Sequence, residues 1–133
     1  MQHTLEKLGP CAELGGRLLL AAIFITAGYG KIEAYAATQS YMAAMGVPAA
    51  LLPLVIATEL GGGLLIAFGL FTRLAAIGLA GFSILAALLF HANFGDTMNQ
   101  IMFLKNLAIA GGFLFLVING AGRISLDRRL GRS

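Results

Sequence analysis

Residues 48–73 read PAALLPLVIATELGGGLLIAFGLFTR, and this stretch carries a single acidic residue, Glu59, near its middle. A hydrocarbon core of ~30 Å needs about 20 apolar residues in a helix, so the stretch predicts a helix that crosses a membrane. A carboxylate at that depth costs roughly 2.5–3.5 kcal/mol on insertion scales. Glu59 therefore needs a cationic partner, a proton or a water-lined cavity, and we interpret the other polar residues as its surroundings.

The composition of the whole chain is that of a membrane protein. Of its 133 residues, 59% are hydrophobic and 11% are charged, whereas about 25% of residues are charged in soluble domains. The net charge of +3 comes from basic residues scattered at the ends of the apolar segments. That distribution is typical of topology signals and not of a basic face that binds nucleic acid. We expect one all-α membrane domain over residues 1–133 and no nucleic-acid partner.

Cysteine and histidine usage limits the redox chemistry that the chain can carry. Cys11 is the only cysteine, which excludes an intrachain disulfide and dithiol chemistry. The two histidines, His3 and His91, lie far apart in sequence with no cysteine cluster, so we expect no transition-metal site and no paired haem ligands. The sequence encodes no cofactor site, and we assign no catalytic or cofactor-binding residue.

Four apolar segments predict an integral membrane four-helix bundle. We place the spans at about residues 14–30, 49–71, 74–91 and 100–118. Residues 1–16 form a polar lead that we expect at the interface. Residues 32–47 are too polar to span and carry tyrosines, so we expect a short interfacial helix between the first and second spans.

Four spans place both termini on one side of the membrane, and the basic residues predict which side that is. Seven lysines and arginines lie on the side of the termini and two lie toward the other side. The seven are Lys7, Arg17, Arg73, Arg123, Arg128, Arg129 and Arg132, and the two are Lys31 and Lys105. The positive-inside rule therefore predicts that both termini are cytoplasmic.

Polar residues from all four spans are expected to converge in the outer half of the bundle. These candidate pocket residues are Glu59, Lys105, His91, Asn106 and Lys31. Side chains lean toward the N-terminus of their helix, so Glu59 and Lys105, on two inward-running spans, both reach outward. We expect these two residues to form an ion pair. The pair is either a structural clasp that fixes helix register or part of a ligand or proton site, since ionisable groups within membranes commonly mark function.

Arg17 and Lys31 lie on one face of the first span, about 21 Å apart along its axis at 1.5 Å per residue. Their head groups either reach water at the two membrane surfaces by snorkelling or make contacts inside the bundle. The sequence leaves both interpretations open.

Several motifs together resemble those of the DoxX family of small bacterial inner-membrane proteins, over about residues 14 to 130. They include Gly16-Arg17-Leu18, Gly30-Lys31, Glu59-Leu60-Gly61-Gly62-Gly63, Phe90-His91, Lys105-Asn106-Leu107-Ala108 and Gly122-Arg123-x-Ser125-Leu126-Asp127. The resemblance implies a four-helix protein of the bacterial inner membrane. Family members often have Trp after the Phe94 position, whereas this chain has Gly95 and no tryptophan.

The resemblance links the chain to subunits of thiosulfate:quinone oxidoreductases, but many family members have no assigned activity. Three functions remain open: a quinone-linked oxidoreductase subunit, a small-molecule or lipid-binding carrier, and a structural or assembly factor of a membrane complex. The first implies quinone as a bound molecule and a redox partner subunit. Small residues at Gly63-xxx-Ala67 and Ala108-xxx-Gly112 also predict a homo-oligomer contact within the bilayer.

Overall fold

The computed structural model describes residues 1–132, which are helical with no strand among them. Four helical stretches are long and apolar enough to cross a membrane. They are α1 (Gln2–Glu33), a composite second stretch (Ala49–Phe68), α5 (Thr72–Phe90) and α6 (Thr97–Asn119). The predicted all-α membrane fold with four spans is therefore confirmed.

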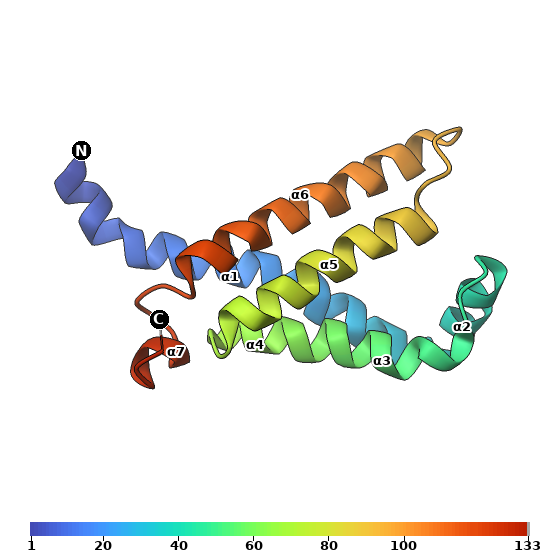
Figure 1. Cartoon of the computed structure of the whole chain (residues 1–133), viewed down its shortest axis with the longest axis horizontal. Coiled ribbons are helices and arrows are strands. Elements are labelled where there is room, and N and C mark those ends of the chain that lie inside the picture. Colours follow the sequence, from blue (N-terminus) through green and yellow to red (C-terminus); the bar gives the residue numbers. More distant parts are fainter. Residues whose placement is uncertain (133) are drawn as a thin grey trace.

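The ends of the chain lie together at one end of the bundle (Figure 1). The helix α2 (Tyr35–Ala44) and the loop between α5 and α6 lie at the opposite end. Helices α5 and α6 pack side by side, and α1 packs along the second stretch. Each of the two adjacent pairs is thus antiparallel, and α6 has its main contacts with α5.

Helix α1 begins much earlier than predicted. The polar lead is not a separate interfacial segment, because the helix runs without interruption from Gln2 through Pro10 to Glu33. Its 32 residues span about 48 Å at 1.5 Å per residue, which exceeds a ~30 Å hydrocarbon core. Figure 1 shows the first turns of α1 projecting beyond the other helices.

The short helix predicted between the first two spans is present as α2, which ends before Gly46, a residue with φ of 77°. Its Met42 is buried with Val47 and Leu52 in a small apolar cluster. This cluster holds α2 against the start of the second span.

Two glycines allow α1 and the second span to touch backbone to backbone. A Cβ atom on Gly28 would lie 2.9 Å from the backbone nitrogen of Leu60, and one on Gly63 would lie 2.9 Å from Cγ1 of Ile25. Small residues permit such close crossings between membrane helices. Around this crossing Phe24, Ile66 and Phe113 form part of the buried core.

The second span is not a uniform α-helix. It comprises η1 (Ala49–Leu51), α3 (Leu52–Ile56), the π-helical turn η2 (Ala57–Gly61) and α4 (Gly62–Phe68). A π-turn accommodates an extra residue in a helix and is frequent at functional sites. Glu59 lies within this turn and is buried.

Candidate functional site

A cavity of about 420 Å³ lies between the four spans and extends to α2. Its volume is within the range of about 300–1,000 Å³ that is usual for small-molecule pockets. All four spans and α2 contribute to its walls, which are mostly apolar and include Phe24, Phe82 and Phe90. The polar lining residues are Lys31, Thr38, Thr58, Glu59, Ser83, His91, Lys105 and Asn106.

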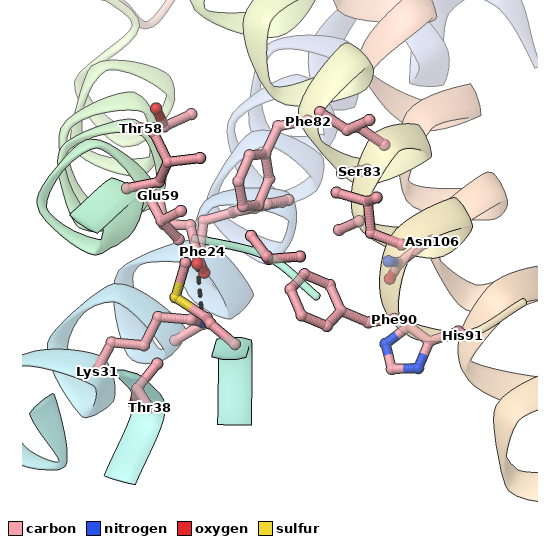
Figure 2. Close-up of a pocket in the computed structure, with 18 of the residues that line it drawn as sticks. Phe24, Lys31, Thr38, Thr58, Glu59, Phe82, Ser83, Phe90, His91 and Asn106 are labelled. Atoms are coloured by element: carbon pink, nitrogen blue, oxygen red, sulfur yellow. Dashed lines mark ion pairs between the residues drawn. The ribbon is translucent and has the colours of Figure 1, made fainter. Parts of the chain in front are cut away.

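The structure brings all five predicted pocket residues to this one cavity. Lys31 comes from the last turns of α1, Glu59 from η2, His91 from the end of α5, and Lys105 and Asn106 from α6. Figure 2 shows Glu59 and Lys31 on one side of the cavity and Asn106 and His91 on the other.

The ion pair at Glu59 has a different partner from the one predicted. Lys31 Nζ lies 2.8 Å from Glu59 Oε1, and this is the only ion pair within residues 1–132. The expected pair between Glu59 and Lys105 is wrong because α6 packs on α5 and not on the second span. The glycine crossing instead places the end of α1 beside η2. Lys31 therefore makes a contact inside the bundle.

Ser83 is a cavity residue that the sequence analysis missed. It is 2% exposed, and its hydroxyl has no hydrogen-bond partner. Figure 2 shows Ser83 on the same side of the cavity as Asn106. A lone serine in an apolar helix has no distinguishing pattern, and only its helical face relative to Phe82 and Ala86 could have pointed to it.

The part of the cavity wall near α2 includes aromatic and polar side chains, namely Tyr41, Phe90 and His91. The rings of Tyr41 and Phe90 stack with their centroids 5.5 Å apart. His91 Nδ1 lies 3.5 Å from Asn99 Oδ1, across the loop between α5 and α6. Tyr41 thus links α2 to the end of α5.

At the opposite end of the bundle, Arg17 is buried and does not snorkel. It is 2% exposed, and its guanidinium donates to the carbonyl oxygens of Ala121 at 2.6 Å, Ile124 at 2.9 Å and Ala67 at 3.1 Å. The chain after α6 returns across the bundle and supplies two of these three acceptors. Arg17 therefore ties α1 to the end of the second span and to the C-terminal segment.

Asp127, the second residue of α7 (Leu126–Arg129), closes the same end. Its carboxylate accepts hydrogen bonds from the backbone N–H groups of Phe71 at 2.8 Å and Thr72 at 2.9 Å. Burial alone would raise the pKa of the Asp127 carboxyl, but these backbone hydrogen bonds and the nearby Arg132 outweigh burial and lower that pKa below its ordinary value. At this end of the molecule, the bonds of Arg17 and Asp127 therefore hold the C-terminal segment against α1, the second span and the Phe71–Thr72 turn.

Comparisons with known proteins agree with the family resemblance of the sequence motifs. A sequence model of the DoxX family matches residues 12–92, more than half of the chain. The chain belongs to the DoxX family. It is 54% identical over 128 residues to Inner membrane protein YqjF of Escherichia coli (strain K12), covering 96% of this chain and 98% of that protein.

A second relative of this DoxX-family chain is Inner membrane protein YphA of Escherichia coli (strain K12). It is 39% identical over 127 residues, covering 90% of this chain and 91% of that protein. No solved structure matches. Four spanning helices and two relatives named inner membrane proteins make this chain a multi-pass membrane protein of the DoxX family.

Proposed function

We propose that the cavity binds a small, mostly apolar molecule with polar oxygens, and that a quinone is the ligand whose chemistry fits it best. The observation that carries the proposal is the combination of an apolar, aromatic wall with buried polar groups inside a membrane bundle. Phe24, Phe82 and Phe90 offer ring faces and edges for a flat ring. Ser83 and Asn106 offer hydrogen-bond donors for its oxygens.

In the redox form of this proposal, a quinone takes up two electrons and two protons to become a quinol. The Lys31–Glu59 pair is the proton-exchanging group on the cavity wall. The chain has one cysteine and no paired thiol, so the electrons come from a redox partner subunit or a soluble donor.

We propose a cytoplasmic location for both termini and an outer location for the cavity. The support is the excess of basic residues at the end of the bundle where the termini lie. A reporter that is active only outside the cytoplasm should be inactive when fused after residue 133 and active when inserted at Gly95. The reverse pattern would overturn this orientation.

We also propose that the protein forms a homo-oligomer, through a surface other than the one predicted at Gly63 and Gly112. Gly63 faces Ile25, and a Cβ on Gly112 would lie 3.2 Å from Leu20, so both glycines face α1 of the same chain. We place the contact with a second copy instead on the exposed apolar surface near the end of α6, at Phe115 and Ile118.

The test is ligand recovery from protein purified out of native membranes in a mild detergent. A solvent extract is scanned in the ultraviolet before and after borohydride reduction, which identifies quinone by its absorbance change. Ala86→Phe fills the cavity, whereas Ala108→Phe adds the same ring to an exposed position on α6 outside the cavity. We expect quinone with the unmodified chain and with Ala108→Phe, and a large loss with Ala86→Phe.

Other results would point to the other functions. A phospholipid or fatty acid recovered with the same dependence on Ala86 would indicate a carrier instead of a quinone-linked subunit. Equal recovery of every extract component from both variants would contradict ligand binding in the cavity and favour a structural or assembly role.

A further inference from the structure

The wall of the cavity formed by α5 and α6 presents three hydrogen-bond donors that have no acceptor. The Ser83 hydroxyl is buried and unpartnered. The side chains of Asn106 and Lys105 make no hydrogen bond or ion pair with any group of residues 1–132. A donor that is buried and unsatisfied is costly, and among these three the Ser83 hydroxyl is in that state.

The hydroxyl of Ser83 differs in its hydrogen bonding from the other hydroxyl groups near the cavity. Thr38 and Thr58 also line the cavity, and each donates to the carbonyl oxygen four residues earlier in its helix, at 2.8 Å. Ser40, outside the cavity, does the same at 3.2 Å. This local bond is the usual way to satisfy a hydroxyl in a helix. Ser83 does not make this bond, and its hydroxyl lies buried in the cavity wall without a partner in the described chain.

On the facing wall, two opposite charges compensate each other. Lys31 and Glu59 bind each other at 2.8 Å, and Figure 2 shows this pair across the cavity from Ser83 and Asn106, with Phe82 and Phe90 among the side chains between them. The two walls therefore differ in what they offer. One wall carries a closed ion pair, and the other carries three donors without a partner among residues 1–132, including the ammonium of Lys105.

We propose that Ser83, Asn106 and Lys105 bind the acceptor oxygen of the ligand, while its apolar body lies against Phe82 and Phe90. This inference rests on the proposed function, namely that the cavity holds a ligand. The shared chemistry is an acceptor oxygen on an apolar body, as in a quinone carbonyl or a fatty-acid carboxylate. A cationic head group would meet the positive charge of Lys105 on this wall, and that repulsion disfavours its binding there.

The experiment uses the full chain in phosphatidylcholine nanodiscs with a single tryptophan as reporter. The chain has no native tryptophan, so Leu85→Trp, at a half-exposed position that lines the cavity, supplies the only indole. Decylubiquinone is titrated and its quenching of that tryptophan gives Kd. Decanoate and decyltrimethylammonium, which carry the same tail with an acceptor and a cationic head, are then tested as competitors.

We expect Ser83→Ala, Asn106→Leu and Lys105→Met each to raise Kd about five- to tenfold, the effect of losing one hydrogen bond. The matched control is Thr58→Val, which also removes a hydroxyl from the cavity wall. Its hydroxyl is already bound to the Leu54 carbonyl, so its Kd should stay unchanged. Decanoate should displace decylubiquinone, and decyltrimethylammonium should not.

The thermal midpoint provides an independent readout. Ser83→Ala removes an unsatisfied buried hydroxyl, so its Tm should equal or exceed that of the reporter chain even though its affinity falls. A large drop in Tm for Ser83→Ala would show that the hydroxyl serves the fold and would overturn its role in binding.

The failure of this inference is distinguishable from the failure of the proposed function. If the reporter chain binds decylubiquinone and the three variants keep its Kd, or if decyltrimethylammonium competes as well as decanoate, the placement of the acceptor oxygen is overturned and ligand binding stands. If the reporter chain binds neither decylubiquinone nor decanoate, the proposed function is overturned and this inference with it.

Discussion

Lys31 Nζ lies 2.8 Å from Glu59 Oε1 and joins the last turns of α1 to the π-helical turn of the second span. The carboxylate is nearly enclosed, with a side-chain exposure of 4%, whereas the Lys31 side chain keeps 30%. The pair is therefore asymmetric. Glu59 depends on Lys31 for its charge compensation, but Lys31 retains access to the surroundings.

This asymmetry predicts unequal effects of the two single mutations. Lys31→Met leaves an uncompensated buried carboxylate and should lower the free energy of unfolding by up to about 3–5 kcal/mol. Glu59→Gln leaves the partly exposed ammonium of Lys31, which can snorkel. The free energy of unfolding should therefore fall less in Glu59→Gln than in Lys31→Met. The double mutant should recover much of the Lys31→Met loss. Unfolding of the purified protein in mixed micelles of a mild detergent and SDS measures all three.

Lys105→Met is the control for this series. Lys105 makes no ion pair with Glu59, so this change should leave the unfolding free energy nearly unaltered. A loss for Lys105→Met that equals the loss for Lys31→Met would contradict the arrangement of α1, η2 and α6 described above.

The glycine crossing between α1 and the second span gives a second prediction. A methyl group at Gly28 would meet the backbone of Leu60 at 2.9 Å, and helix backbones cannot yield as a side chain can. Gly28→Ala should therefore destabilise the protein by about 1–3 kcal/mol. Gly30→Ala, two residues later with nothing within 4 Å of its Cβ, should be neutral or slightly stabilising. Thermal midpoints in detergent compare the two, and equal midpoints would show that the helices do not cross at Gly28.

Much of this architecture follows from periodicity and charge in the sequence. Four apolar stretches predict the spans, and helical geometry correctly places Glu59, Lys31 and Lys105 at one end of the bundle. The partner of Glu59 could not be found in this way. Depth and helical face do not reveal which helices are neighbours, and here the order of helices gives Lys31, not Lys105, access to the carboxylate.

The hydrogen-bond partners of Arg17 could not be predicted from sequence patterns, for a different reason. Its acceptors are backbone carbonyls of Ala67, Ala121 and Ile124, and a carbonyl group carries no residue identity. Ser83 was missed for a related reason, because the property that distinguishes it is the absence of a local hydrogen bond. Both facts appear only once the chain is folded.

Asp127 predicts a pH dependence of stability. Its pKa in the folded protein is lowered, so its contribution is fully present above the ordinary carboxyl value of about 3.9 and is lost as the pH falls through the lower folded value. Tm should thus stay nearly constant from about pH 7 to pH 5 and then decline in more acidic buffer. Asp127→Asn should lower Tm at neutral pH and flatten this acid decline.

Glu6→Gln, at an exposed position in the first turns of α1, is the control for Asp127. It changes the same kind of charge without touching the Phe71–Thr72 turn, and its Tm profile should follow that of the unmodified protein. An Asp127→Asn profile with the same acid decline as the unmodified protein would assign the decline to other carboxylates.

The contacts of Arg17 predict that a positive charge alone, without the guanidinium geometry, is not enough to hold the C-terminal segment against α1 and the second span. Its planar guanidinium serves three carbonyl oxygens from two separate segments, whereas a lysine ammonium is a compact group on a flexible stem. Arg17→Lys should therefore lower the free energy of unfolding by about 1–3 kcal/mol, the cost of leaving buried acceptors unpaired. Arg123→Lys, at an exposed position in the C-terminal segment, should have little effect. Limited proteolysis is a second measurement. Arg128 and Arg129 are already exposed, and loss of the Ala121 and Ile124 bonds should release α7, so that trypsin cleaves the loosened backbone at these arginines faster. Arg17→Lys protein as resistant to trypsin as the Arg123→Lys control would show that the C-terminal segment is held without the guanidinium.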